Sequence, residues 1–443
     1  MRTYGCQMNE RDSESVACKL QERGYTIVDQ EDKADIVLLN TCSVRDQAEV
    51  KAIGKAGHLS KRKRKNPNFI IGVMGCMAQN RGRELAEKLP KLDLIVGTQK
   101  FHRIPDFLDG LDSSGENGSN SLKLIQIDQE DGSQSEINDH LDSSEKKATS
   151  FVSIMQGCNM NCSFCIVPKT RGKERYRKID EIVLEVNSLA ARGVREVTLL
   201  GQIVNAYGRG EIARKAGKSP FVQLLDKIHE IAGIDRIRFT SPHPISFGDD
   251  LIEAFARLPK LCSYAHLPMQ SGSNKILRAM NRPYSIEKFL SIVGKLRQVN
   301  SGIRLSTDVI VGFPGETETD FELTKSAFKE ASFEMGFIFK YSERSGTQAA
   351  QLEDRVPLPV KERRNQELLA LLEKQSHSSN QLLVGRTLEI LVEGFAKKGE
   401  GRLIGRTKCF RKVIFEGSAD LIASLVDVNI TSTGGSTLKG VVA

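Results

Sequence analysis

Three cysteines stand close together near the middle of the sequence. Cys158, Cys162 and Cys165 follow directly on an apolar run, 151–155, that is typical of a strand. Three thiolates at the exit of a strand can face one point and bind a metal there. Zinc sites and ferredoxin clusters usually have four ligands, and no fourth lies nearby in the sequence. A 4Fe–4S cube held by three thiolates keeps one iron open to a chelating substrate. A structural zinc knuckle with a distant fourth ligand is the alternative, which this spacing disfavours.

A second group of cysteines is scattered over the first 80 residues. Cys6, Cys42 and Cys76 each come just after a candidate strand, and Gly5 and Gly75 allow the backbone to approach closely there. The carboxyl ends of parallel strands lie along one edge of a sheet, so we expect these thiols to converge on a second metal site. Three unrelated buried thiols are the alternative. The remaining cysteines show no such relation and are expected to be structural thiols: Cys18, Cys262 and Cys409.

Composition narrows the class of protein. The chain has 443 residues, a formal net charge of +8 and nine cysteines, and 39% of its residues are hydrophobic. It contains no apolar run long enough for a membrane helix and no signal-peptide core after Met1, so we expect a cytoplasmic protein. The strand before Cys6 is short, as if residues preceded Met1. The charge permits a polyanionic partner without requiring one.

Apolar periodicity predicts an α/β protein built from several domains. In residues 1–110, strands alternate with helices, which is typical of an open parallel sheet. One of these helices is expected to begin at Asp12 or Ser13 and to end at Gly24. Residues 111–149 are polar, acidic and rich in Ser and Gly, which predicts a flexible linker with one short strand at 122–127.

Two further domains are predicted after this linker. Residues 150–378 contain six strands separated by helices, which is too few for a closed eight-stranded barrel and indicates an open (β/α)6 barrel. Residues 380–443 lose the helices, and their short strands separated by Gly predict a small β-barrel. The strands expected there are 386–392, 401–407, 412–415 and 425–431.

The central cysteine motif resembles that of a known enzyme superfamily. CxxxCxxC with an aromatic residue, Phe164, before the last cysteine resembles the radical S-adenosylmethionine signature. The resemblance implies that the open iron binds the amino and carboxylate groups of S-adenosylmethionine. It also implies that an electron from the cluster breaks a carbon–sulfur bond and releases a 5′-deoxyadenosyl radical.

Segments along almost the whole chain are similar to the radical methylthiotransferases. Residues 3–9, 40–45 and 75–79 resemble the N-terminal domain of these enzymes. Residues 241–244, 267–273 and 308–317 resemble their catalytic domain, and residues 405–408 resemble their RNA-binding TRAM domain. The sequence Gly-Cys-Gln-Met-Asn around Cys6 is similar to the tRNA-2-methylthio-N6-dimethylallyladenosine synthases. Two other branches usually carry Pro-Lys or Lys-Val in place of Gln7-Met8.

This resemblance implies conversion of N6-(dimethylallyl)adenosine at position 37 of a tRNA to its 2-methylthio derivative. The implied cofactors are two 4Fe–4S clusters and S-adenosylmethionine, and the implied partners are the anticodon stem-loop and a reducing electron donor. We expect a monomer and assign no catalytic residue beyond the cluster ligands. The alternatives are action on threonylcarbamoyladenosine, action on a ribosomal protein side chain, or an RNA-binding protein with structural metal sites. The basic C-terminal barrel argues against a protein substrate.

Contacts to the cofactor and to RNA are predicted from position and charge. Four polar residues at or beyond strand ends are candidates for S-adenosylmethionine or adenosine contacts, namely Gln202, Asn205, Gln270 and Asp308. Two basic segments, 169–178 and 397–412, are expected to contact RNA phosphates. In the second, the candidates are Arg402, Arg406, Lys408, Arg411 and Lys412. The chain departs from the family at Ile203 and Phe410, where Asn is common.

Overall fold

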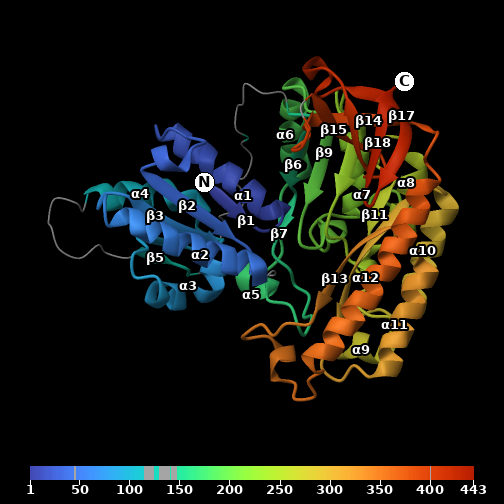
Figure 1. Cartoon of the computed structure of the whole chain (residues 1–443), viewed down its shortest axis with the longest axis horizontal. Helices are drawn as coiled ribbons and strands as arrows, with labels where there is room; N and C mark the ends of the chain where they lie inside the picture. Colours follow the sequence, from blue (N-terminus) through green and yellow to red (C-terminus); the bar gives the residue numbers. More distant parts are fainter. Residues whose placement is uncertain (44–45, 114–123, 129–139, 141–146, 400) are drawn as a thin grey trace. The chain divides into compact units, whose positions relative to one another are not determined.

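The computed structural model describes residues 1–43, 46–113, 124–128, 140, 147–399 and 401–443 (Figure 1). Most of the predicted linker, 111–149, lies outside these residues. The chain divides into two compact units. The first comprises Met1–Asp142, Met155–Met160 and Ile166–Glu181, and the second comprises Ser143–Ile154, Asn161–Cys165 and Ile182–Ala443. The division into domains at 1–110, 111–149, 150–378 and 380–443 stays a prediction.

The first unit is built on a parallel sheet, as the sequence predicts. Its strands are hydrogen-bonded in the order in which they follow along the chain, and every pairing is parallel. The strands are β1 Arg2–Tyr4, β2 Ile36–Thr41, β3 Ile70–Gly75, β4 Leu94–Val96 and β5 Leu124–Gln126. The helices are α1 Gln7–Glu22, α2 Asp46–Lys63, α3 Cys76–Lys88 and α4 Ile104–Ser113. The unit also contains α5 Val167–Arg171 and the antiparallel pair of β7 Met155–Gln156 with β8 Arg175–Tyr176.

Helices cover both faces of this sheet, because successive strand residues point to opposite sides. On one face, Val37 and Leu39 pack with the apolar residues of α2 and α3. On the other, Leu38 packs with those of α1 and α4. Helix α1 begins at Gln7, so the start predicted at Asp12 or Ser13 is wrong, and the residue that caps α1 is a cysteine.

The second unit contains six parallel strands in two sheets of three. The order β6-β9-β10 continues through backbone hydrogen bonds of Ile237 with Lys260 and Cys262 toward the order β11-β12-β13. The strands are β6 Thr149–Ser153, β9 Glu196–Leu200, β10 Arg236–Phe239, β11 Tyr264–His266, β12 Arg304–Val311 and β13 Met335–Lys340. This arrangement confirms the predicted open barrel.

Helices follow these strands along the chain. They are α6 Ile179–Ala191, α7 Pro220–His229, α8 Asp249–Arg257, α9 Asn274–Ala279, α10 Ile286–Val299, α11 Glu318–Ala331 and α12 Leu358–Gln381. Figure 1 shows α10, α11 and α12 side by side. In the described part of the chain, no helix is both long and apolar enough to cross a membrane.

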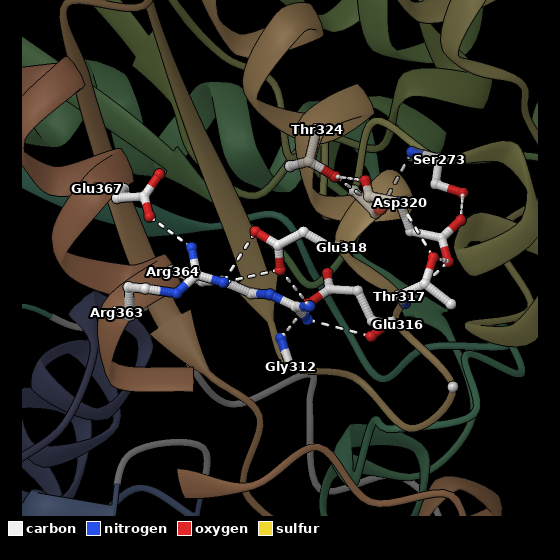
Figure 2. A network of polar contacts seen from close by, with 12 residues as sticks. Ser273, Gly312, Glu316, Thr317, Glu318, Asp320, Thr324, Arg363, Arg364 and Glu367 are labelled. Carbon is white, nitrogen blue, oxygen red and sulfur yellow. Dashed lines mark hydrogen bonds and ion pairs between the residues drawn. The ribbon is translucent and has the colours of Figure 1, made fainter. Parts of the chain in front are cut away.

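A buried ion pair fixes the turn between β12 and α11 (Figure 2). The carboxylate of Glu316 accepts from the backbone N–H of Gly312 at 2.6 Å and from Arg364 of α12 at 2.7 Å. Burial raises the pKa of Glu316, whereas Arg364 and the Gly312 N–H act in the opposite direction. The side chains of Glu316 and Arg364 are 0% and 4% exposed, so this pair joins the turn to α12 with little competition from water.

The C-terminal residues form the predicted small β-barrel. It is closed, with the strand order β14-β15-β16-β18-β17 and a core that includes Val392, Leu403 and Ile430. The strands are β14 Thr387–Phe395, β15 Arg402–Thr407, β16 Lys412–Glu416, β17 Leu425–Gly434 and β18 Thr437–Val442. Strand β18, which closes the barrel by pairing with both β16 and β17, was not predicted from the sequence.

Candidate functional site

The N-terminal sheet brings the three scattered cysteines to one edge. The last residues of β1, β2 and β3 are paired in register. Cys42 and Cys76 come directly after β2 and β3, and Cys6 comes two residues after β1. The backbone N–H of Cys42 donates to the carbonyl of Tyr4 at 2.9 Å, which holds the exits of β1 and β2 together. The predicted convergence of these cysteines is therefore visible in the strand register, and their binding of a metal stays a prediction.

Two of these cysteines also stand at helix N-termini, which the sequence analysis did not foresee. Cys6 caps α1 and Cys76 is the first residue of α3. A hydrogen bond with the Cys42 thiol lowers the pKa of Cys6 to about 6, against the effect of burial and with help from the charge of Arg171. Burial raises the pKa of Cys76.

This set of donors fits an iron–sulfur cluster, because thiolates are the ligands of such clusters. As the side chains of the described residues stand, no three His, Cys, Asp or Glu form a group that could hold a metal ion. Cys6, Cys42 and Cys76 would hold the cluster, and a positive charge already lies beside them in Arg171.

Two asparagines position this edge and were missed by the sequence analysis. The Asn9 side chain donates to the amide oxygen of Asn40 at 3.0 Å, and the Asn40 side chain donates back to the Asn9 carbonyl at 2.9 Å and to the Ser13 hydroxyl at 3.0 Å. The amide oxygen of Asn9 accepts from the Cys6 thiol at 3.3 Å. Asn9 and Asn40 are fully buried, so they link α1 to β2 and orient Cys6. The sequence did offer a signal for their role, because Asn9 and Asn40 lie within three residues of Cys6 and Cys42.

The glycines at this edge are required by close approach. A Cβ on Gly5 would lie 2.8 Å from the Cβ of Cys42, and one on Gly75 would lie 2.8 Å from the carbonyl oxygen of Thr41. Gly75 also has a φ of +99°, which disfavours any side chain. The strand ends therefore meet more closely than residues with side chains would allow, as the sequence analysis expected.

Local contacts within each unit hold the central cysteine loop. In the first unit, the backbone N–H of Cys158 donates to the carbonyl of Gly172 at 3.0 Å, and its Sγ accepts from the Met160 N–H at 3.4 Å. A Cβ on Gly157 would lie 1.8 Å from the carbonyl oxygen of Lys173, so only glycine fits before Cys158. The backbone of the loop is thus fixed where this first thiol begins.

In the second unit, Cys162 and Cys165 lie in a turn closed by a hydrogen bond between their own backbones at 3.0 Å. The Cys162 Sγ accepts from Arg282 Nη1 at 3.3 Å. Arg282 is positioned by Tyr284, whose hydroxyl donates to the carbonyl of Pro268 at 2.9 Å. A guanidinium that donates a hydrogen bond to a sulfur suits a cysteine ligand of an iron–sulfur cluster. The surroundings of Cys162 therefore fit those of a cluster ligand. The sequence analysis did not identify Arg282.

The four residues predicted to contact cofactor or adenosine differ in their surroundings. The Asn205 side chain is engaged with the backbone of His243, donating to its carbonyl at 3.0 Å and accepting from its N–H at 2.8 Å. Gln270 is 8% exposed, and its Oε1 is buried without a hydrogen-bond partner. The Asp308 carboxylate lies 3.2 Å from the His266 ring. Gln202 is half-buried after β9. Gln270 and Asp308 can accept hydrogen bonds from a ligand, whereas Asn205 holds two loops together.

The basic residues of the C-terminal barrel fall into two groups. Arg402 is exposed, and Arg406, Lys408 and Lys412 are half-buried. Arg411 differs from the expected RNA contact, because it is 6% exposed and its guanidinium donates to Asn380, Glu334 and Ser379. Arg411 therefore attaches the barrel to α12 and does not face solvent.

The basic segment 169–178 is divided in the same way. Its lysines are exposed, whereas Arg171 and Arg177 are buried. The guanidinium of Arg171 donates to Asp12 at 2.6 Å, inside the first unit. The charge run therefore does not form one continuous RNA-binding surface, because two of its arginines point into the protein.

Three buried arginines attach the C-terminal barrel to the open barrel of the second unit. Arg236 Nη1 donates to the carbonyl of Arg406 at 2.7 Å, and Arg238 Nη1 donates to that of Lys408 at 3.0 Å. Arg304 Nη1 donates to the carbonyl of Phe410 at 3.0 Å. These arginines lie at or near the starts of β10 and β12, so the turn between β15 and β16 is held at the amino end of the strands.

Phe410, where the family commonly has Asn, lies in this turn. Its φ is +65°, a conformation that Asn tolerates better than Phe does. The ring is 5.0 Å from that of Tyr264, and the guanidinium groups of Arg238 and Arg406 lie 4.7 and 4.9 Å from its centre. Aromatic and cation–π contacts therefore offset the strained backbone.

Comparisons with known proteins agree with this geometry. Residues 1–97 match the uncharacterized protein family UPF0004, residues 152–327 the radical SAM superfamily and residues 381–443 the TRAM domain. A radical S-adenosylmethionine methyltransferase, TsrM from Kitasatospora setae, aligns with a TM-score of 0.57 at 14% identity. The alignment covers 76% of this chain and 73% of TsrM, and it shows a shared fold.

Curated relatives extend over the whole length. The tRNA-2-methylthio-N(6)-dimethylallyladenosine synthase of Opitutus terrae is 55% identical over 99% of this chain and 96% of its own length. The synthase of Akkermansia muciniphila is 49% identical over 100% of this chain and 98% of its own. These similarities, together with the two cysteine groups, show that the chain belongs to the tRNA-2-methylthio-N(6)-dimethylallyladenosine synthase family.

Proposed function

We propose that this enzyme methylthiolates C2 of N6-(dimethylallyl)adenosine at position 37, in the anticodon loop of tRNA. The observation that carries the proposal is the convergence of Cys6, Cys42 and Cys76 at one sheet edge, in a chain that also has a radical S-adenosylmethionine motif. A radical enzyme that only cleaves S-adenosylmethionine has no use for this second thiol group. Sulfur insertion gives it one.

Each cysteine group would hold its own 4Fe–4S cluster. The first would use Cys6, Cys42 and Cys76, and the second Cys158, Cys162 and Cys165. When bound, the clusters and S-adenosylmethionine supply the radical and the sulfur and methyl groups. The protein holds the thiolates, donates a hydrogen bond from Arg282 to the Cys162 sulfur, and presents Gln270 and Asp308 as hydrogen-bond acceptors.

RNA binding is assigned to the C-terminal barrel. Arg402, Arg406, Lys408 and Lys412 lie on β15, β16 and the turn between them, and they would contact phosphates. The target base must leave the stacked loop to reach the catalytic centre, as bases do in other nucleic-acid enzymes. The barrel would therefore fix the tRNA while the base enters elsewhere.

The prenyl group gives a physical reason for substrate choice. Burial of an apolar five-carbon tail contributes on the order of 2–3 kcal/mol of binding. That free energy favours prenylated over bare adenosine by roughly 30- to 150-fold. Selection for the modified base needs no reading of the loop sequence.

The test offers purified enzyme two forms of the same tRNA, prenylated and bare, and measures nucleosides by mass spectrometry. We expect the 2-methylthio product predominantly on the prenylated tRNA. Equal modification of both forms would contradict the proposal, and so would product only on threonylcarbamoyladenosine or on a ribosomal protein. A cytoplasmic location, a monomeric state and a separate electron donor stay predictions.

A further inference from the structure

A buried arginine lies beside the N-terminal cysteines, and one of its guanidinium nitrogens has no hydrogen-bond partner. Arg171, the last residue of α5, donates from Nη2 to Asp12 Oδ2 at 2.6 Å. The two side chains are 3% and 0% exposed. Arg171 Nη1 and Asp12 Oδ1 are both buried without a hydrogen-bond partner. A buried guanidinium normally has its donors occupied, so Nη1 can donate to a further acceptor.

The cysteines are the groups near enough to supply that acceptor. Helix α5, which ends at Arg171, packs against α3, which begins at Cys76, and Asp12 lies in α1, which Cys6 caps. Two more hydroxyls beside the site, those of Thr41 and Ser43, are buried without partners, and they flank Cys42. Hydrogen-bond donors in this position suit the sulfurs of an iron–sulfur cluster.

The backbone around Arg171 is fixed within the first unit. The Thr98 hydroxyl donates to the carbonyl of Thr170 at 2.5 Å, and the carbonyl of Gly172 accepts from the Cys158 N–H at 3.0 Å. Gly172 has a φ of +74°, and a Cβ there would lie 2.9 Å from the Gln99 side chain. The backbone that carries Arg171 is therefore held on both sides, and Asp12 holds the guanidinium itself.

We propose that Arg171, oriented by Asp12, is a positioning residue for the cluster of Cys6, Cys42 and Cys76, and that its guanidinium stabilises the negative charge of that cluster. The inference rests on the proposed function. Adding an electron to a cluster raises its negative charge, so a buried cation beside it makes reduction easier. Arg171 therefore raises the reduction potential of the N-terminal cluster, and Asp12 lowers it while orienting Arg171.

The test measures the potential of this cluster alone. The full chain with Cys158, Cys162 and Cys165 changed to Ala is reconstituted anaerobically and titrated with reductant, followed by electron paramagnetic resonance. Arg171→Gln should lower the equilibrium constant for reduction at least tenfold, which is about 59 mV for one electron. Asp12→Asn keeps an oxygen that can accept from Arg171 but removes the negative charge, so it should shift the potential in the opposite direction.

Two further variants separate charge from packing. Arg171→Lys keeps the charge and should stay within threefold of the parent. Arg364→Gln breaks a different buried arginine–carboxylate pair, with Glu316 in Figure 2, and should lower the melting temperature with no change in potential. Where Arg171→Gln retains no cluster, Asp12→Asn and Arg171→Lys still decide the question.

The proposal is overturned by shifts of the same sign in Arg171→Gln and Asp12→Asn, since structural damage would produce that pattern. The proposal is also overturned if Asp12→Asn leaves the potential unchanged and Arg171→Gln either leaves it unchanged or retains no measurable cluster. Failure of the proposed function is distinguishable, because the parent variant would then contain no iron before any change at Arg171.

Discussion

The two cysteine groups are built in different ways. Cys158, Cys162 and Cys165 lie within one loop, so their spacing in sequence defines the site. Cys6, Cys42 and Cys76 are far apart in sequence and meet only because three parallel strands are in register. The loop site depends on local backbone, whereas the sheet site depends on the fold of the whole N-terminal unit. The residues that surround the sheet site, among them Asn40 and Arg171, are likewise far apart in sequence.

Loss of the loop site should have the largest effect. Changing Cys158, Cys162 or Cys165 to Ala should abolish formation of 5′-deoxyadenosine, because each thiolate binds a different iron. Chromatography of the reaction products measures this, and the N-terminal cluster should remain. Deoxyadenosine at the wild-type rate in all three variants would show that the radical does not originate in this loop.

Loss of the sheet site should separate cleavage from product formation. With Cys6, Cys42 and Cys76 all changed to Ala, S-adenosylmethionine should still be cleaved while no methylthio nucleoside forms. Cys18→Ala is the matched control, since Cys18 is buried in α1 and is not predicted to be a ligand. Full product formation by the triple variant would mean that the sheet site has no part in sulfur insertion.

The barrel surface should affect binding in a graded way. Removing the domain would expose Arg236, Arg238 and Arg304, so point variants are the better test. Arg402→Gln with Lys412→Gln should weaken tRNA binding on the order of tenfold and reduce the slope of log K against log salt by about 2.

The control removes two exposed charges from helices α9 and α10, with Arg278→Gln and Lys295→Gln, and should leave the salt slope unchanged. Binding is measured by fluorescence anisotropy at several salt concentrations. An unaltered slope in the Arg402 and Lys412 double variant would place the RNA surface elsewhere.

The sheet site should also show its character in the cluster-free protein. Because the pKa of Cys6 is lowered to about 6, its thiolate persists at pH 7 and is lost as the pH falls through 6. Alkylation of Cys6 by iodoacetamide, followed by peptide mass spectrometry, should therefore have a midpoint near 6. The Cys42→Ala variant removes the hydrogen bond and should move the midpoint upward. A wild-type midpoint near the ordinary thiol value of about 8.5 would contradict the described geometry.

The smallest effect is expected at Phe410. Phe410→Asn relieves a left-handed backbone strain of about 1–2 kcal/mol and loses ring contacts of similar size. The free energy of unfolding should change by less than about 1 kcal/mol, as measured by urea denaturation. Phe410→Ala loses the contacts without the benefit of Asn and should be the less stable variant. A large loss in Phe410→Asn would mean that the ring contacts dominate.

Much of this architecture could be predicted from the sequence. Apolar periodicity gave the parallel sheet, the open barrel and four strands of the small barrel, because those strands are buried and regularly spaced. Side-chain contacts were harder to predict. Arg171 and Arg411 look like surface charges in the sequence, yet both are buried. Their partners, Asp12 and Glu334, lie 159 and 77 positions away. The start of α1 was also misplaced, since Cys6 caps it where Ser, Thr or Asp is usual.

Iron and sulfide counting after anaerobic reconstitution tests most directly whether the two cysteine groups are separate cluster sites. Wild-type protein should hold about eight irons, from two cubes of about four each. The Cys6, Cys42 and Cys76 triple variant and the Cys158, Cys162 and Cys165 triple variant should each keep about half of that. Zinc in place of iron would contradict the account, and so would a wild-type content of only about four irons that both triple variants lose.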